Sequence, residues 1–326
     1  MTQRKFLVTG GAGFIGDALV QALANQGHFV RSFDNGWRHT GATATPNPLI
    51  EPFQGDIRDP NSVNEAARGM DIVCHLAAIN GTKHFYEHPD LVLEVGVKGM
   101  LNVLDACKSQ GIKELITTSS SEAYQTPPHT PTDESVPLIV PDPRNPRYSY
   151  GGSKLISELL TLHAPYLNRA SIVRPHNVYG PAMGWEHVVP EFIIRMAELC
   201  ESSQAEINFP IQGSGNETRS FVYVSDMVDG FLKVIENGKH REIYHVGTED
   251  EITIADLAIA IGKTFDRKIN LMTTPLTHGS TVRRCPSIQK IQGIGYHPQV
   301  SLTEGLAKTA RWYTENRHRR PKKMAA

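Results

Sequence analysis

The sequence predicts an α/β protein built on a doubly wound parallel sheet, and three observations indicate this class. Short apolar runs suited to buried strands alternate with segments of helical periodicity. The first of these runs is followed by closely spaced glycines and then directly by a helical segment. The length of 326 residues allows one large α/β domain or two smaller ones. Strands that alternate with helices in this way form right-handed crossovers in a parallel sheet.

A strand, a glycine turn and a helix at the start of the chain form a predicted cradle for a diphosphate. The strand covers Phe6–Val8 and the helix covers Phe14–Ala24. Three glycines and two helix-start residues line the cradle: Gly10, Gly13, Phe14, Ile15 and Gly16. The first glycine allows the tight turn, the second lets the backbone approach the diphosphate, and the third lets the helix pack closely on the strand. Free amides at the helix start attract phosphate, so the segment predicts dinucleotide binding.

The next strand supports this prediction and indicates which dinucleotide binds. Residues 29–33 form an apolar stretch that ends in Asp34, at the distance expected for a carboxylate that binds the adenosine ribose. Asn35 follows it in the predicted cofactor site, at the start of a loop rich in Gly, Thr and Pro. A carboxylate repels a 2′-phosphate and therefore favours NAD over NADP, although Arg31 and Arg38 lie close to it in sequence.

Two further strands bring residues to the same edge of the sheet. The third predicted strand, Glu51–Gly55, is followed by Asp56 and Ile57, and Asp56 is placed to meet the adenine. The alternative role of Asp56 is an N-cap for the helical segment from Asn61. The fourth strand begins at Asp71, and its small final residues would let the backbone pass close to the cofactor: Leu76, Ala77 and Ala78.

The predicted catalytic residues follow the fifth strand, Glu114–Thr118, which comes after a long helix at about residues 90–110. A serine cluster ends this strand, and a later helix that reaches about Leu167 carries Tyr150 and Lys154. A spacing of four residues places these two side chains on one face of a helix. The ammonium of Lys154, beside an oxidised nicotinamide, would favour the phenolate of Tyr150, which could then take a proton from a sugar hydroxyl. Alone, such a pair is common on helix surfaces and carries no function.

The combination resembles the extended short-chain dehydrogenase/reductases, and more narrowly their NAD-dependent epimerase/dehydratase branch, which acts on nucleotide sugars. The resemblance runs from Val8 to about Trp312. As a set, the matching segments are highly specific: Thr9–Gly16, Gly55–Asp59, His75–Ala78, Ser119–Tyr124, Tyr150–Lys154, Arg174–Pro181 and Arg219–Asp226. Two positions depart from the usual pattern, because Gly96 stands where an asparagine is common and His176 stands where an aromatic is usual. A packed histidine bonded to the backbone is the expected role of His176.

The resemblance implies roles for further residues. Ser120 would hold the substrate hydroxyl in line with Tyr150, and Tyr150 and Lys154 would also contact the bound NAD. Residues on the substrate side would be Asn177, Val189, Phe209, Arg219 and Arg284. Phe209 would pack on the nucleotide base, and the two arginines would hold the diphosphate through charge-assisted hydrogen bonds. A surface ion pair is the alternative role of either arginine.

The resemblance also implies how the chain is divided. Residues 1–175 with about 221–250 would form an NAD-binding domain of the Rossmann type. Residues 176–220 with about 251–316 would form a smaller C-terminal substrate-binding lobe. Residues 317–326 would be a solvated basic tail. Two copies would associate as a homodimer through the two helices around Asp90–Gln110 and Tyr150–Leu167.

Glu122 separates the reactions that the resemblance allows. A 4-epimerase needs only Ser120, Tyr150 and Lys154, which oxidise C4 of a nucleotide-linked hexose with bound NAD before hydride returns to the other face. A 4,6-dehydratase also needs a base for the C5 proton, and a glutamate two residues before Tyr124 would serve there. Nucleotide-glucuronate decarboxylases carry a glutamate at this point too. We expect 4-epimerisation, with dehydration or decarboxylation through Glu122, or a merely amide-bonded Glu122, as the alternatives.

Composition bears on the other classes of function. The net charge of −1 and the pI near 6.9 give no electrostatic case for nucleic acid or an anionic membrane as a partner. No apolar run approaches the ~18 residues of a membrane span, and the first residues do not form a secretory signal. The four cysteines lie far apart, so we expect a cytoplasmic protein with reduced thiols and no metal. A non-catalytic NAD sensor or scaffold is the alternative of another class, but such proteins typically lack the tyrosine or the lysine.

Overall fold

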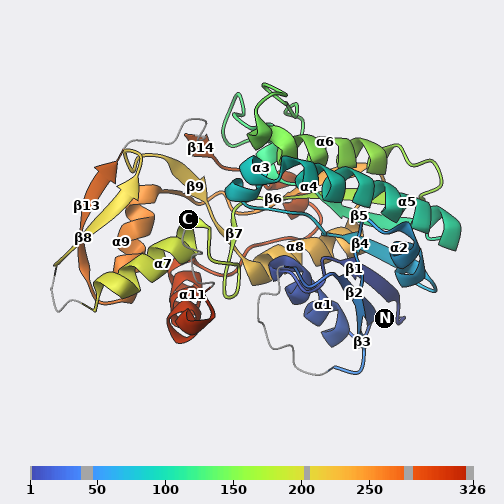
Figure 1. Ribbon diagram of the computed structural model, residues 1–326, viewed down its shortest axis with the longest axis horizontal. Helices are drawn as coiled ribbons and strands as arrows, with labels where there is room; N and C mark the ends of the chain where they lie inside the picture. The colour runs from blue at the N-terminus through green and yellow to red at the C-terminus, as the bar shows by residue number, and fades with distance from the viewer. Residues whose placement is uncertain (1, 38–46, 202–205, 275–281, 321–326) are drawn as a thin grey trace.

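A seven-stranded sheet forms the centre of the computed structural model, which describes residues 2–37, 47–201, 206–274 and 282–320 (Figure 1). Its order is β11-β6-β5-β4-β1-β2-β3, and every neighbouring pair is parallel. The strands are β1 (Lys5–Thr9), β2 (Phe29–Asp34), β3 (Ile50–Gln54), β4 (Ile72–His75), β5 (Glu114–Thr118), β6 (Arg169–Pro175) and β11 (Glu242–Val246). The chain leaves β1 in one direction to β2 and β3 and then returns to β4 on the other side, and ligands bind at such a switch point. The predicted doubly wound fold is confirmed.

Helices cover both faces of this sheet, and its central strands β1, β4, β5 and β6 are mostly buried. One core cluster joins β1 and β4 to helices on one face, which are α1 (Phe14–Asn25), α8 (Val224–Asn237) and α10 (Gln289–Gln292). A second cluster lies on the other face, under α2 (Pro60–Ala67), α3 (Thr82–Glu87), α4 (Pro89–Leu93), α5 (Gly99–Gln110) and α6 (Ser149–Leu162). Buried strands such as β4, in which all four side chains are inside, are typical of parallel sheets.

A smaller group of elements packs at the carboxyl edge of the sheet, on the left of Figure 1. It contains three small sheets, formed by β7 (Val178–Tyr179) with β10 (Val222–Tyr223), by β8 (Glu206–Gln212) with β13 (Lys268–Thr274), and by β9 (Thr218–Ser220) between β12 (Glu251–Thr253) and β14 (Arg283–Arg284). Its helices are α7 (Val188–Leu199), α9 (Ile254–Thr264) and α11 (Leu302–Glu315). A third core cluster joins these elements, and it includes Phe192, Leu257 and Tyr313. The cleft between this lobe and the sheet edge therefore has two independently packed walls.

Two predicted helices differ from the structure. The helix that carries Tyr150 ends at Leu162 and not at about Leu167, because Pro165 offers no amide and disfavours the helical conformation of the residue before it. The predicted long helix contains a π-helical turn, Glu94–Lys98, around Gly96. A Cβ at Gly96 would lie 2.6 Å from the Cβ of Ser153, so glycine permits close packing against α6. The structure thus gives a packing role to the glycine that stands where an asparagine is common.

The described part of the chain contains no helix that is long and apolar enough to cross a membrane. Within the same residues, no three His, Cys, Asp or Glu side chains gather as a set of metal ligands. All four cysteines are free thiols, and only Cys200 is not fully buried.

Candidate active site

One cavity of about 1600 Å³ runs along the carboxyl edge of the sheet, between the strand ends and the smaller lobe. Most of the predicted site residues line it: Gly10, Gly13, Phe14, Ile15, Gly16, Asp34, Asn35, Ile57, Leu76, Ala77, Ala78, Ser120, Glu122, Tyr150, Lys154, Asn177 and Arg284. Four predicted residues do not line it: Asp56, Val189, Phe209 and Arg219. The cavity has a cofactor end at the glycine turn and a second end beyond Tyr150.

The glycine turn leaves no space for side chains at two of its positions. Gly10 has a φ of +73°, and a Cβ there would lie 2.9 Å from the amide nitrogen of Ala77. A Cβ at Gly16 would lie 2.0 Å from the carbonyl oxygen of Gly10. The amides of Gly10 and Gly11 both donate to the carbonyl of Phe33, which fixes the turn between β1 and β2. The start of α1 carries no side-chain cap, so its first amides face the cavity as a diphosphate site requires.

Asp34 lies at the end of β2, where its carboxylate joins the glycine turn to the following loop. Its oxygens accept hydrogen bonds from the amide of Ala12 at 3.1 Å and from the amide of Gly36 at 2.8 Å. The backbone of Leu76 and Ala77 is held on the other side of β1, because both amides donate to the hydroxyl of Thr9. A carboxylate beside a side-chain-free turn fits the ribose and diphosphate of a dinucleotide.

Asp56 is not the N-cap of α2, which was the alternative role that the sequence offered for it. Its carboxylate receives two hydrogen bonds from Arg58, at 3.0 and 2.8 Å, and these lower the pKa of Asp56 to about 2. The N-cap of α2 is Asp59, whose carboxylate accepts from the amide of Asn61. Arg31, which raised the question of NADP, forms an ion pair with Glu51 at 2.6 Å. The other arginine in question, at position 38, lies outside the described residues.

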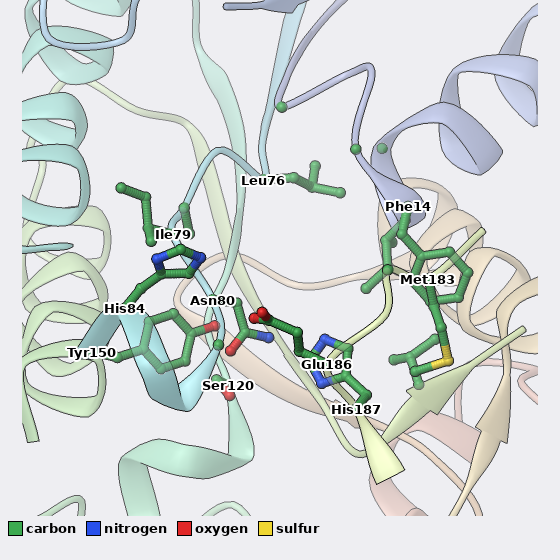
Figure 2. Close-up of a pocket in the computed structure, with 18 of the residues that line it drawn as sticks. Phe14, Leu76, Ile79, Asn80, His84, Ser120, Tyr150, Met183, Glu186 and His187 are labelled. Carbon is green, nitrogen blue, oxygen red and sulfur yellow. The ribbon is translucent and has the colours of Figure 1, made fainter. Parts of the chain in front are cut away.

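Tyr150 and Lys154 lie together on the first turns of α6, as their spacing predicted. The ring of Tyr150 stacks on Phe85 with centroids 5.0 Å apart, and the Nζ of Lys154 lies 5.7 Å from the centre of the Tyr150 ring. Figure 2 shows Ser120 and Tyr150 on the same side of the cavity. Ser120 caps the short turn after β5, and its hydroxyl accepts from the amide of Glu122 at 3.1 Å. The structure therefore brings the predicted serine, tyrosine and lysine to one place.

The ammonium of Lys154 is buried, and the carboxylate of Glu158 offsets part of the cost of burying its charge. Burial lowers the pKa of Lys154 to about 8, and the carboxylate of Glu158 one turn later opposes this shift. The ammonium donates to the carbonyl of Thr118 at 2.7 Å, which holds it between β5 and the Tyr150 ring. Glu158 is itself held by Arg174, which donates to both of its oxygens at 2.8 and 2.6 Å. A lysine in this setting can change its charge near neutral pH.

Glu122 and Arg284 form an ion pair that the sequence did not indicate. Arg284 Nη1 donates to Glu122 Oε1 at 2.5 Å, across 162 positions of sequence. Burial would raise the pKa of Glu122, but the charge and hydrogen bond of Arg284 outweigh it, and Arg147 and Arg219 act in the same direction. The pKa of Glu122 is therefore lower than usual, and its carboxylate is ionised.

The other predicted substrate residues lie at different depths. Asn177 lines the cavity in a left-handed conformation, with φ +38°, and its amide donates to the carbonyl of Ser220. Phe209 is fully buried in the third core cluster and contacts Phe192, so its side chain faces the core and not a ligand. Val189 is also buried in that cluster. The apolar alternation of β8 could have indicated the inward direction of Phe209, because every second residue of the strand is buried.

Arg219 lies behind the cavity wall. One of its nitrogens donates to the carbonyl of Thr218 at 2.7 Å. Burial, and then the nearby charge of Arg284, lower the pKa of Arg219 to about 10. Arg219 thus contributes positive potential to the neighbourhood of Glu122 while its side chain lies outside the cavity lining.

The resemblance also implied that residues 183–190 line the sugar side; several of them line the cavity, and the structure adds a segment after β4. A loop between β7 and α7 contributes Trp185, Glu186 and His187, and the segment after β4 contributes Asn80 and His84 (Figure 2). Sequence spacing alone does not place these side chains, because their positions depend on how separate segments of the chain pack. The loop is anchored by the hydrogen bond from the Tyr313 hydroxyl to the carbonyl of Gly184.

The predicted basic tail begins with a short helical turn, Arg317–Arg319, and its residues His318, Arg319 and Arg320 are exposed to solvent. Arg317 and Arg320 form ion pairs with Glu201 and Glu198 at 2.7 and 2.8 Å. Arg319 and Arg320 also line the cavity. Acidic residues at the end of α7 therefore hold the basic segment beside the cavity, and residues 321–326 lie outside the described part of the chain.

His176 is buried, but it does not have the backbone-bonded ring that we expected. Neither ring nitrogen has a hydrogen-bond partner among the described residues, and the ring meets that of His245 with centroids 4.7 Å apart. Burial and then the neighbouring His245 hold the pKa of His176 far below its usual value, so the ring is neutral. The Nε2 of His245 is hydrogen-bonded to the hydroxyl of Tyr124 at 2.7 Å.

Comparison with known proteins agrees with this geometry. The family described as "NAD dependent epimerase/dehydratase family" matches residues 6–247. A UDP-N-acetyl-alpha-D-glucosaminuronate decarboxylase of Bacillus cytotoxicus is 32% identical over 96% of this chain and 98% of its own. A putative UDP-glucose 4-epimerase of Methanocaldococcus jannaschii is 31% identical over 95% of this chain and 98% of its own. The structure of a dTDP-glucose 4,6-dehydratase of Streptomyces venezuelae, solved with NAD and TYD bound, matches with a TM-score of 0.83 at 28% identity, covering 97% of this chain and 98% of that one.

These relatives carry three different enzyme names, and they give no support to a non-catalytic scaffold. The site fits NAD, which is the cofactor of the family. Gly10 and Gly16 leave no space for a Cβ, the start of α1 has no side-chain cap, and Asp34 supplies a carboxylate. The resemblance found in the sequence is confirmed. The chain belongs to the NAD-dependent epimerase/dehydratase family of extended short-chain dehydrogenase/reductases.

Proposed function

We propose that this chain is a nucleotide-sugar 4-epimerase that begins by oxidising C4 of a nucleotide-linked hexose. The observation that carries the proposal is the convergence of Ser120, Tyr150 and Lys154 on the cavity that also contains the glycine turn. A sugar beyond Tyr150 would lie next to the nicotinamide end of a dinucleotide that starts at Asp34. The relatives named above act on UDP- and dTDP-linked sugars by their names, which supports the same class of substrate here.

Each of the three side chains has a defined part in this reaction. The hydroxyls of Ser120 and Tyr150 would bind the C4 hydroxyl of the sugar, and Tyr150 would take its proton. The ammonium of Lys154 would stabilise the phenolate that accepts this proton. NAD, when bound, accepts the hydride from C4 and later returns it. Tyr150 would give the proton back after the keto sugar has turned over, so that the net reaction inverts C4.

The Glu122–Arg284 ion pair supports epimerisation over dehydration. A dehydratase would need Glu122 as the base for the C5 proton, yet its carboxylate is engaged by Arg284 at 2.5 Å. In the epimerase the pair would instead fix the direction of Arg284, whose other nitrogens could meet the diphosphate of the substrate. Simple 4-epimerisation requires no base beyond Tyr150.

Decarboxylation is the second candidate, and the charges near Glu122 favour it. Arg147, Arg219 and Arg284 all lie close enough to lower the pKa of Glu122, so three cations surround one anion. An additional carboxylate, such as C6 of a hexuronic acid, would be attracted there. Once C4 is a ketone, that carboxylate is in the β position and leaves as carbon dioxide without a dedicated base. The similarity to a decarboxylase over 96% of the chain is consistent with this candidate.

Mass spectrometry on a panel of UDP- and dTDP-linked hexoses and hexuronic acids tests the proposal. We expect a product of unchanged mass with inverted C4, and no net accumulation of NADH. Loss of carbon dioxide from a hexuronic acid would establish the second candidate in its place. Loss of water, or deuterium at C5 after reaction in heavy water, would show that Glu122 or another base acts and would overturn the epimerase.

We further propose that two copies form the working enzyme through α5 and α6. These helices expose three apolar side chains: Leu101 is 44% exposed, Ile156 38% and Leu159 52%. Large apolar patches are rare on the surfaces of soluble monomers. Leu159→Glu should convert a dimer to a monomer in size-exclusion chromatography with light scattering. The charge-neutral control is Leu93→Gln, which lies at a 40% exposed position on α4. A monomeric parent protein would contradict this proposal.

A further inference from the structure

Two loops of the chain meet across the cofactor end of the cavity. Trp37 follows β2, His84 lies on α3 after β4, and their ring centroids are 5.1 Å apart. In the sheet, β2 and β4 are the two neighbours of β1. A contact between their following segments therefore spans the carboxyl end of β1, where the glycine turn begins. Both rings also line the cavity.

The backbone on each side of this contact is held in place. The side chain of Asn35 accepts from the amide of Trp37 at 3.0 Å, and Asp34 accepts from the amide of Gly36. On the other side, Phe85 is only 5% exposed and stacks on the Tyr150 ring. Figure 2 shows the neighbouring His84 ring directed into the cavity near Tyr150. The two rings thus meet because their backbones are fixed from opposite walls.

The exposure of Trp37 indicates that this contact has a purpose beyond packing. Its side chain is 49% exposed, although an indole contributes far more to stability when it is buried. It lies three positions after Asp34, on the wall of the predicted adenosine site. A dinucleotide that runs from Asp34 past the glycine turn to Tyr150 would pass beneath the two rings and would cover the free face of the indole.

We propose that Trp37 and His84 are cofactor-binding residues that close the site over the diphosphate and adenosine ribose, so that NAD remains bound between turnovers. For NAD to leave, the two rings must separate, and their contact is lost in the transition state for release. The inference depends only on NAD binding and holds whichever sugar reaction follows. An enzyme that returns the hydride to its own product needs no exchange of the cofactor, and a closed site suits that chemistry.

The test is the rate at which the whole protein releases NAD. Protein loaded with isotopically labelled NAD is mixed with an excess of unlabelled NAD, and the labelled fraction still bound is followed by mass spectrometry. Trp37→Ala and His84→Ala should each release NAD roughly 2- to 12-fold faster, which is the factor that an aromatic pair worth about 0.5–1.5 kcal/mol provides. The double variant should release it about as fast as the faster single variant, because both substitutions remove the same contact.

The matched control is Tyr86→Ala, because Tyr86 lies on the same helix, is 47% exposed and is absent from the cavity lining. It should release NAD at the parent rate. Trp37→Phe retains an aromatic ring and should fall between the parent and Trp37→Ala. Release at the parent rate from both alanine variants would overturn the proposal. So would single-variant effects that multiply in the double variant, since the rings would then act separately.

Discussion

The cofactor end and the substrate end of the cavity are built in different ways. At the cofactor end the backbone forms the site, through hydrogen bonds such as those from Gly10 and Gly11 to the carbonyl of Phe33 and through glycines that approach other backbone atoms. At the substrate end side chains from distant segments form it, as in the Glu122–Arg284 pair separated by 162 positions and the Arg320–Glu198 pair separated by 122. Neighbouring strands fix the geometry of the cofactor end. The geometry of the substrate end depends on how several separate loops pack.

Because of this difference, we expect the two ends of the cavity to be sensitive to different kinds of substitution. One added methyl group should disrupt the backbone-built end, because nothing there can move away without moving a strand. At the end built from side chains, changes of size matter less and changes of charge matter more, because ion pairs position the groups. Tyr150 lies where the two ends meet and should be sensitive to the loss of a single oxygen.

The largest effect is expected from Tyr150→Phe, which removes the acid–base group at the boundary and keeps the stacking on Phe85. Turnover should fall by roughly 10²- to 10⁴-fold, the range of a general acid–base contribution, while NAD remains bound. Product formation, followed by chromatography that separates the two C4 epimers, measures it. Tyr148→Phe, a variant two residues earlier and outside the cavity lining, should retain full turnover. Equal turnover in the two variants would remove Tyr150 from the mechanism.

Gly16→Ala tests the backbone-built end with one methyl group. The new Cβ would lie 2.0 Å from the carbonyl oxygen of Gly10, so the turn must shift before the helix can pack. A displacement of this size should weaken NAD binding on the order of 100-fold, measured by calorimetry. Gly152→Ala is the control, because its Cβ would first meet Val140 at 3.5 Å and α6 tolerates alanine. Unchanged NAD affinity in Gly16→Ala would show that the turn is not the diphosphate site.

The sequence predicted the cofactor end well because its determinants are local. Gly10, Gly13 and Gly16 lie within one turn and its helix, and Asp34 ends the neighbouring strand, so motif spacing reports directly on their positions. The alternative role of Asp56 as an N-cap was wrong, because Asp59 lies next to the first residue of α2 and caps it.

The substrate end was predicted less well because its determinants are tertiary. Nothing in the spacing of Glu122 and Arg284 indicates that they meet, and the folded position of Arg320 depends on the acidic end of α7. The direction of Phe209 was readable from the alternation of β8, but a functional role from resemblance took precedence over it. A resemblance assigns a role to a segment, but it does not fix the direction in which each side chain of that segment points.

Glu122→Gln tests the substrate end of the cavity, which is built from side chains. The amide keeps the shape and removes the charge that holds Arg284. If Glu122 only positions Arg284, KM should rise roughly ten-fold, for the loss of a charged hydrogen bond worth about 1.5 kcal/mol, while kcat changes little. Steady-state kinetics separate the two constants. The matched control is Glu251→Gln, which breaks the adjacent pair with the 53% exposed Arg283 and should leave KM unchanged. A collapse of kcat at constant KM would instead identify Glu122 as the base of a dehydratase.

The smallest expected effect is a change with pH that comes from Lys154, whose pKa burial lowers to about 8. The side chain is charged below that pH and neutral above it, so its stabilisation of the Tyr150 phenolate is lost as the pH rises. The lysine-dependent part of kcat should therefore fall by about half at this pH and by roughly ten-fold one unit above it.

Lys154→Arg provides the comparison, because a guanidinium stays charged over this range, and its profile should lack the alkaline decline even if its turnover is lower. The rate is measured with saturating substrate across the two pH units around the lysine pKa. An identical decline in the arginine variant would assign it to another group and would leave Lys154 with a role in orientation alone.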